Sequence, residues 1–533
     1  MRKIKLKSNK IITVDTSVKE LITILLKNRQ ILSKDAREFL FPPYPQPSLA
    51  GLIRAVARIK KAIRNKENIL VYGDYDVDGL TATAILWQVL NKLGAQVWPF
   101  IPHRQLDGYG FKAQSFYRFQ QEKGVKFNLV ITVDNGIVAG REFKKLKDVE
   151  VIVADHHLPD DKLPEVYSII HSTKLSGSGL AWVLASNLDK KADLGLAALG
   201  TVADCLPLTG VNRQIVVHGL KKLSTDPCPG LKQLLSVSAV RKAEISAYEL
   251  GFVLGPRLNA VGRLADPTDG LRLLCSRSEN QAAKYAAILD GRNLERRDLE
   301  KEGITKAEQL IDCQQNILVA VDKSFLPGVI GLIAGRLTEK YYLPTIIIAE
   351  DKDISKASCR SIPEINIIKL LRNFTDLLLD LGGHAQAAGF SILTKNIPKF
   401  IHQIEKYPLK KFNRPIQAEA RMLLSAVNMR NIRAIERLAP FGLGNPKPVF
   451  LFEKAVITGK RMLGSDHNHL KLILNDSVKA IAFRRKDLDS ALNMGDIINL
   501  TASVETDDYG GTASPQLIIK EIFKSNDGGS FKK

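Results

Sequence analysis

Short apolar runs that alternate with amphipathic segments are the feature that most restricts the fold of this chain. The apolar runs lie at residues 69–72, 96–101, 129–133 and 149–154. Segments with helical spacing lie before and between them, at residues 51–65, 80–93, 113–123 and 138–147. Alternation of short buried strands with helices is typical of a doubly wound parallel sheet. We therefore predict an α/β fold that binds its ligands beyond the carboxyl ends of the strands.

Acidic side chains follow the first apolar run, where the strand should end. Asp74, Asp76 and Asp78 stand there at alternate positions. In extended backbone such side chains point to the same side, so we expect the three carboxylates to converge. Their mutual repulsion would raise their pKa values unless a cation lay between them. An acidic turn is the plain alternative, but three carboxylates at this spacing favour a site for a divalent metal.

Further candidate ligands follow the later strands. They are Asp134 after the third run, His156 and His157 after the fourth, and Asp204 farther along the chain. Carboxylates with imidazoles, and without a thiolate, suit Mn²⁺ or Mg²⁺ better than a structural zinc ion. Because these ligands exceed the need of one ion, we predict two divalent cations that share a carboxylate and promote phosphodiester hydrolysis. One histidine would bind metal while the other faced the substrate.

Composition indicates the kind of partner. Lys and Arg number 77 against 56 for Asp and Glu, a formal net charge of +21, which favours a polyanion such as nucleic acid. The five cysteines include no C-x-x-C pair, and no apolar run is long enough to span a bilayer. The basic amino terminus lacks the apolar core of a secretory signal. We therefore expect a soluble cytoplasmic protein without a membrane partner.

The rest of the chain is expected to form further parts. A long charged helix should connect the first α/β domain to a second, smaller one. Short alternating strands near the end suggest an OB-like β-barrel, a fold that commonly holds single-stranded nucleic acid. The expected parts are an N-terminal extension (1–45), the first α/β domain (46–278), the connector (279–312), the second α/β domain (313–410), a linker (411–448), the OB-like domain (449–523) and a disordered tail (524–533).

Six motifs, in this order, resemble those of the DHH phosphoesterases. They read D-Y-D-V-D-G from Asp74, V-D-N-G from Val133, D-H-H from Asp155, A-D-C-L-P-L from Ala203, G-P-R-L-N-A-V-G-R from Gly255 and G-G-H-A-Q-A-A-G-F from Gly382. The resemblance covers most of the chain and is closest to the members that act as exonucleases on single-stranded DNA. It implies metal-dependent cleavage from a 5′ end and release of 5′-mononucleotides.

The resemblance also implies roles for individual residues. The implied metal ligands are Asp74, Asp76, Asp78, Asp134, His156 and Asp204. Asp134 would bridge the two ions, and His157 would stabilise the charge of the scissile phosphate. The implied nucleic-acid contacts are Arg104, Arg257, Asn259, Arg263, Ser358, Arg360 and His384. Ser358 and Arg360 resemble a pocket for the 5′-terminal phosphate. The sequence departs from the family pattern at Leu326, Cys359 and Tyr509, where His, Gly and Trp are usual.

Three functions are compatible with these patterns. The leading hypothesis is a monomeric 5′→3′ exonuclease for single-stranded DNA that serves repair and recombination beside a helicase and a single-strand-binding protein. The second is a DHH phosphodiesterase acting on short oligonucleotides or cyclic dinucleotides, but the basic charge and the OB-like part argue against it. The third is a catalytically silent relative that binds nucleic acid. Loss of metal ligands would mark that class, and none is visibly lost.

Overall fold

The computed structural model describes residues 4–104, 106–240, 244–464, 466–508 and 513–524. Contacts divide the chain into two compact units, each assembled from separate stretches of sequence. The two-sheet unit comprises Ser48–Ala203 and Lys222–Arg414. The barrel unit comprises Met1–Pro47, Asp204–Lys221 and Pro415–Lys533. Tyr509 and most of the expected tail, residues 525–533, lie outside the described residues.

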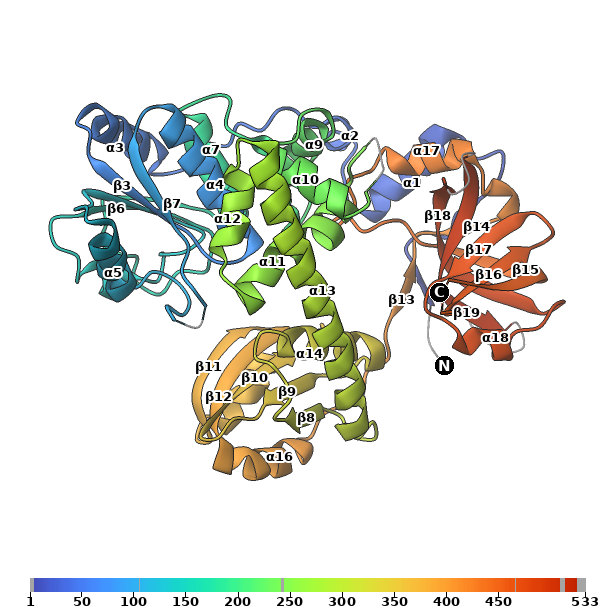
Figure 1. Cartoon of the computed structure of the whole chain (residues 1–533). Coiled ribbons are helices and arrows are strands. Elements are labelled where there is room, and N and C mark those ends of the chain that lie inside the picture. The colour runs from blue at the N-terminus through green and yellow to red at the C-terminus, as the bar shows by residue number, and fades with distance from the viewer. Residues whose placement is uncertain (1–3, 105, 241–243, 465, 509–512, 525–533) are drawn as a thin grey trace. The chain divides into compact units, whose positions relative to one another are not determined.

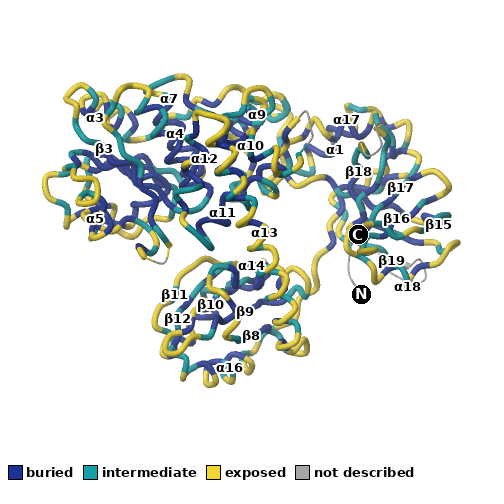
Figure 2. Tube along the Cα trace, viewed as in Figure 1, coloured by how far each residue is buried: buried dark blue, intermediate teal, exposed yellow. Residues whose placement is uncertain are grey.

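A five-stranded parallel sheet forms the first half of the two-sheet unit and confirms the predicted doubly wound fold (Figure 1). Its spatial order is β4 (Gln96–Phe100), β3 (Asn68–Tyr72), β5 (Leu129–Val133), β6 (Glu150–Asp155) and β7 (Ser168–His171). The three central strands are almost entirely buried (Figure 2), because their Ile, Val and Leu side chains are covered on both faces. The short edge strand β7 was not predicted.

Helices connect and follow these strands. Their bounds are α3 (Leu52–Arg64), α4 (Val77–Lys92), α5 (Ala113–Lys123), α6 (Gly140–Phe143), α7 (Gly177–Ser186), α8 (Leu194–Ala203), α10 (Pro229–Val237), the π-helix η1 (Glu249–Leu254), α11 (Gly255–Leu264) and α12 (Thr268–Cys275). Helix α6 is shorter than the predicted segment 138–147. Helix α11 directly continues η1 and has Pro256 in its first turn.

A 32-residue helix, α13 (Glu279–Leu310), connects the two sheets. It contacts α10, α11 and α12 as well as α14 and β8. The second sheet has the order β11 (Leu378–His384), β12 (Ala387–Leu393), β10 (Ile354–Arg360), β9 (Thr345–Ala349) and β8 (Leu318–Asp322). Helices α14 (Ile330–Tyr341), α15 (Ile367–Leu371) and α16 (Ile397–Glu405) accompany it. The glycine-rich stretch 382–390 belongs to the hairpin β11–β12.

The barrel unit contains a closed ring of five strands, which confirms the predicted OB-like part. The ring runs β15 (Phe450–Leu463), β16 (His469–Leu474), β17 (Val478–Ala482), β19 (Ser514–Lys524) and β18 (Ile497–Asp507), and β18 pairs with β15 again. Two short strands, β14 (Arg421–Met422) and β2 (Ile11–Ile12), extend this sheet from β15. Helices α1 (Val18–Asn28), α2 (Ala36–Leu40), α17 (Met429–Glu436) and α18 (Asp487–Ala491) complete the unit, and α9 (Gly210–Thr225) crosses its boundary.

The N-terminal residues differ from the peripheral extension that the sequence suggested. Strand β1 (Ile4–Leu6) pairs in parallel with β13 (Ile416–Ala418), and β2 pairs with β14. Helix α1 buries Leu21 and Leu25 in the same apolar core as Phe450 and Leu470 of the barrel. The supposed linker 411–448 likewise contributes two strands and α17. Local periodicity missed these pairings because each joins residues about 400 positions apart.

A shortened chain that lacks residues 449–533 is therefore expected to be insoluble or to lose its N-terminal residues to proteolysis. The deletion would expose Ile12, Leu21 and Leu25, whose partners lie in the removed strands. Solubility and limited proteolysis with intact-mass analysis would measure the effect. A soluble shortened chain with a protease-resistant segment 1–47 would contradict it.

Candidate active site

The candidate site lies where neighbouring parallel strands end. When the five parallel strands are numbered in chain order, their spatial order is 2-1-3-4-5. The order of the strands therefore reverses between the neighbours β3 and β5, and open α/β sheets bind ligands at such a point. Asp74 follows β3, Asp134 follows β5, and His156 follows β6. The sheet thus brings together groups that lie up to 82 positions apart in sequence, from Asp74 to His156.

The D-Y-D-V-D-G segment is not extended as expected. Asp76 caps α4, because its Oδ1 accepts a hydrogen bond from Gly79 N at 3.0 Å, and Asp78 lies in the first turn of that helix. Asp78 turns towards α7 and accepts hydrogen bonds from the backbone N–H groups of Gly177 (2.6 Å) and Ser178 (2.9 Å). The prediction that all three carboxylates converge is therefore only partly right. Asp74 and Asp76 offer oxygens within 4.8 Å of each other from a loop and a helix start, whereas Asp78 points towards α7.

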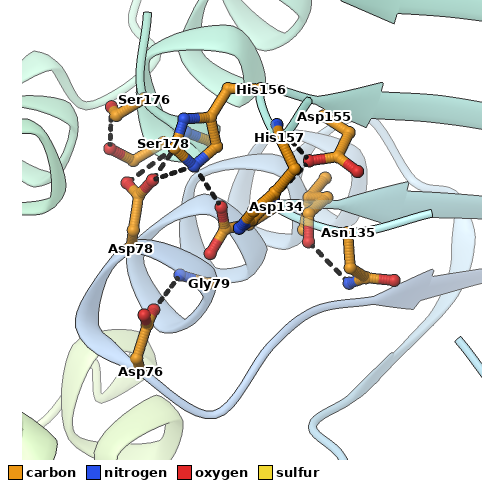
Figure 3. Close-up of polar contacts among 12 residues, drawn as sticks. Asp76, Asp78, Gly79, Asp134, Asn135, Asp155, His156, His157, Ser176 and Ser178 are labelled. Atoms are coloured by element: carbon orange, nitrogen blue, oxygen red, sulfur yellow. Dashed lines mark hydrogen bonds and ion pairs between the residues drawn. The ribbon is translucent and has the colours of Figure 1, made fainter. Parts of the chain in front are cut away.

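Two groups of potential ligands meet at Asp134. Asp74, Asp76 and Asp134 each offer a carboxylate oxygen within 4.8 Å of the others. Asp134 also forms a group with His156 and His157, again with ligand atoms within 4.8 Å. Figure 3 shows Asp134 facing His156, whose Nε2 lies 3.1 Å from Asp134 Oδ1 and 3.8 Å from Asp78 Oδ2. Asp134 is thus the carboxylate that belongs to both groups.

Electrostatics of the carboxylate cluster favour a bound cation. Burial and the neighbouring charge of Asp76 raise the pKa of Asp74 to about 8. Burial and the charge of Asp78 also raise the pKa of Asp76. Asp74 Oδ1 is buried and has no hydrogen-bond partner among the described residues. Burial lowers the pKa of His156, which keeps its imidazole in the neutral form that binds metals. The donor set fits hard divalent cations.

The second histidine of the motif, His157, is held by two side chains to which the sequence analysis gave no role. His157 Nδ1 lies 2.8 Å from Asp155 Oδ1, and His157 Nε2 lies 2.8 Å from the Tyr109 hydroxyl. Burial opposes ionisation of Asp155, but hydrogen bonds from His157 and from Ile137 N outweigh burial and lower its pKa. Asp155 was recognised in the sequence only as the first residue of the D-H-H motif, without a role of its own, and Tyr109 gave no signal.

The predicted arginines have partners within the two-sheet unit. Arg257 Nε donates to Asp290 Oδ1 of α13 at 2.8 Å, and Arg263 Nη1 donates to Gly328 O at 3.1 Å. Burial, together with the guanidinium groups of Arg104, Arg296 and Arg360, lowers the pKa of Arg263 to about 10. Positive charge is therefore concentrated around Arg263, which favours an anion nearby. Arg296 was not predicted; it lies on the charged connector helix, where a solvated face was expected.

The predicted terminal-phosphate pocket lies on the second sheet. Arg360 Nη1 donates to Ser358 Oγ at 3.2 Å, at the carboxyl end of β10. A Cβ atom on Gly331 would lie 3.0 Å from both Ser358 Oγ and Arg360 Nη2, so the start of α14 passes close to both side chains. Cys359 is fully buried in the core beneath this sheet.

The remaining predicted residues are Asn259, Arg104, His384 and Asp204. Asn259 Oδ1 accepts a hydrogen bond from Val77 N at 3.2 Å. Arg104 lies over the Tyr75 ring, 5.8 Å from its centroid. His384 is exposed at the end of β11, and Asp204 directly follows α8. Among the described residues, no helix combines the length and the apolarity that crossing a membrane requires.

Comparison with known proteins gives matches along the chain. Residues 68–206 match the N-terminal domain of the DHH family, 314–408 match the DHHA1 domain, and 418–521 match the RecJ OB domain. The chain is 34% identical over 531 residues to the single-stranded-DNA-specific exonuclease RecJ of Bacillus subtilis, covering 94% of this chain and 67% of that protein. It is 30% identical to the Escherichia coli protein of the same name, covering 90% of this chain and 91% of that protein.

Solved structures give the same relationship. The crystal structure of RecJ in complex with Mn²⁺ from Thermus thermophilus is similar with a TM-score of 0.83 and 29% identity, over 98% of this chain and 80% of that chain. A structure of exonuclease RecJ bound to manganese is similar with a TM-score of 0.61 and 35% identity, over 68% of this chain and 96% of that chain. With all three domain types matched in order, the chain belongs to the RecJ family.

Proposed function

We propose that this chain is a metal-dependent 5′→3′ exonuclease that hydrolyses single-stranded DNA to 5′-mononucleotides. The observation that carries the proposal is the pair of ligand groups that share Asp134. The relatives are named single-stranded-DNA-specific exonucleases, which supports the proposed substrate and reaction, whereas the 5′→3′ direction rests on the family resemblance of the motifs.

The proposed ligands of two divalent cations, Mn²⁺ or Mg²⁺, are Asp74, Asp76, Asp78, Asp134, His156 and Asp204. When bound, such a pair neutralises phosphoryl oxygens and lowers the pKa of the water that attacks phosphorus. Asp134 would hold both ions, because it is the member common to the two groups. The Gly177 and Ser178 N–H groups fix the Asp78 carboxylate, which limits its rotation towards other partners.

His157 is proposed to contact the scissile phosphate through Nε2. Asp155 accepts the hydrogen bond of Nδ1 and so fixes the orientation of the ring. In this structure the Tyr109 hydroxyl lies 2.8 Å from His157 Nε2, where we expect a phosphate oxygen to approach.

The DNA strand is proposed to follow the basic residues from the carboxylate cluster to the second sheet. Ser358 and Arg360 would bind the 5′-terminal phosphate, since a guanidinium fork suits phosphate oxygens. Arg104, Arg257, Arg263 and His384 would contact the backbone. The OB-like barrel would hold a more distant part of the strand.

The proposal extends to the cellular setting. The family resemblance suggests a cytoplasmic monomer. It would work with a helicase and a single-strand-binding protein in repair and recombination. The cysteines support a reducing compartment, because no two of them form a disulfide in the part of the chain that the structure describes.

Digestion of end-labelled strands tests reaction, direction and substrate together. Single-stranded DNA, double-stranded DNA and RNA would be incubated with Mn²⁺, Mg²⁺ or a chelator. We expect a 5′ label to appear first as a mononucleotide, from single-stranded DNA and only with metal. Release of a 3′ label first, or digestion in chelator, would contradict the proposal. Faster cleavage of dinucleotides or cyclic dinucleotides than of long strands would instead favour the alternative, a phosphodiesterase for short substrates.

A further inference from the structure

Helix α11 contacts the metal-binding loop through two residues on consecutive turns. The side-chain Oδ1 of Asn259 accepts a hydrogen bond from Val77 N at 3.2 Å. One turn later, Gly262 faces the backbone of Tyr75, and a Cβ atom there would lie 2.6 Å from Tyr75 O. Both contacts fall on the peptide units that flank Asp76. The helix therefore touches the loop at its backbone, beside the proposed ligands.

The loop needs such anchors because its own side chains repel one another. Asp74 and Asp76 lie two residues apart on this loop, and their carboxylate oxygens come within 4.8 Å of each other, so their like charges repel when both are ionised. Val77 N belongs to the first turn of α4, where backbone N–H groups have no partner within the helix. An amide oxygen can accept this hydrogen bond without adding charge. A lysine there would compete with the cation for the carboxylates. The neutral side chain of Asn259 does not compete, so the carboxylates stay available to the cation.

Helix α11 also contacts the second α/β part of the two-sheet unit. Arg263 Nη1 donates to Gly328 O at 3.1 Å. A Cβ atom on Gly328 would lie 2.6 Å from Arg263 O, so two backbones approach closely there as well. Helix α11 thus contacts the metal-binding loop and the segment before α14 within ten residues of sequence.

We propose that α11 is a positioning helix, which holds the Asp74–Asp78 loop in the geometry that binds metal through Asn259 Oδ1 and through the close approach at Gly262. The family resemblance assigned Asn259 to nucleic acid, whereas the structure assigns it to the loop backbone. The inference rests on the proposed two-metal site, because it concerns residues that support the ligands of that site. Neither residue contacts a reacting atom.

Mn²⁺ binding to the full-length chain tests this proposal without any measurement of cleavage. Calorimetry, or the electron paramagnetic resonance signal of free Mn²⁺, would give the affinity of the wild type and of Asn259→Ala and Asn259→Asp. Loss of a residue that orients metal ligands typically lowers affinity by about 10–100-fold. We expect a loss in this range for Asn259→Ala. Asn259→Asp retains an oxygen for Val77 N and is expected to stay within about threefold of the wild type or to bind more tightly.

A second pair of variants tests the close approach. Gly262→Ala would force Tyr75 O to move and should weaken Mn²⁺ binding about tenfold or more. Gly291→Ala is the matched control, because Gly291 lies on exposed helix α13 with no atom within 4 Å of a Cβ. Gly291→Ala should keep the wild-type affinity and gain up to about 1 kcal/mol of stability from helix propensity. Melting curves in chelator would show that each variant is folded.

The outcomes separate this inference from the proposed function. A wild type that binds no Mn²⁺ would refute the two-metal site itself. A wild type that binds Mn²⁺ together with an unchanged affinity in Asn259→Ala and Gly262→Ala would refute only the role of α11. Equal losses in Asn259→Ala and Asn259→Asp would also refute it, because the acceptor oxygen would not matter. Should Asn259→Ala fail to fold, the comparison of Gly262→Ala with Gly291→Ala decides.

Discussion

Replacing Asp134 by Ala is expected to abolish hydrolysis of single-stranded DNA while leaving DNA binding largely intact. Asp134 is the carboxylate common to both ligand groups, so its loss weakens both proposed ions at once. Metal ions contribute several kcal/mol to the stabilisation of phosphoryl transition states, and each 1.36 kcal/mol is a factor of ten in rate. We therefore expect the rate of mononucleotide release to fall by at least about 10³-fold, whereas filter binding of a long oligonucleotide changes little.

Asp148→Ala is a matched control for this substitution. Asp134 and Asp148 both have left-handed backbone, with φ of 62° and 55°, so alanine is strained at either position. Asp148 is 82% exposed and pairs only weakly with Lys126, and its replacement should leave hydrolysis unchanged. Mn²⁺-dependent hydrolysis that survived in Asp134→Ala would contradict the two-metal assignment. Equal losses in both variants would attribute the effect to the backbone instead.

The second large effect concerns stability. In a chelating buffer, the melting temperature is expected to fall by on the order of 5 °C or more as the pH rises from about 5 to about 9. The pKa of Asp74 is about 8 in the folded chain, against 3.8 for the unperturbed carboxyl, through burial and the charge of Asp76. The folded state therefore favours the protonated group. Its stabilising contribution is complete below the unfolded pKa and is lost as the pH rises through the folded pKa.

Mn²⁺ should reverse this trend, because the cation replaces the proton between the carboxylates. Asp74→Asn is the control, because an asparagine side chain cannot ionise. In this variant the melting temperature in chelator should fall less with rising pH, and Mn²⁺ should raise the melting temperature less. Scanning calorimetry of both chains across the pH range, with and without metal, would measure these slopes. A melting temperature in chelator that rose between pH 5 and pH 8 would show that the buried carboxylates do not repel one another as the geometry implies.

The first sheet was predictable because its strands are short, apolar on both faces and ended by polar residues. The strand at 129–133 was placed at its observed bounds, and the fold class alone predicted that the candidate ligands after three strands would lie at one edge of the sheet. The local path of the D-Y-D-V-D-G segment was not predictable in this way. Alternating aspartates suggested extended backbone, whereas the capping hydrogen bond from Gly79 N to Asp76 starts helix α4 one residue later.

The features that the sequence missed depend on tertiary contacts. The stretch from Gly255 has Pro and Gly at positions typical of a loop, yet its glycine at 262 serves close packing against Tyr75 O rather than a turn. The hairpin at 378–393 contains too many small residues to be recognised as strands. Tyr109 became a candidate only because the loop after β4 brings its hydroxyl to His157. No spacing along the chain encodes such a contact.

The division of the chain into interleaved stretches has a consequence for biosynthesis. The barrel unit needs residues 4–28 at one end of the chain and the strand Ser514–Lys524 at the other. During synthesis from the amino terminus, the apolar side chains of α1 therefore lack these barrel partners until the strand that ends at Lys524 has been made. The two-sheet unit ends at Arg414 and can form earlier. We expect a nascent chain released after about residue 415 to carry a folded two-sheet unit and an exposed, chaperone-dependent amino-terminal helix.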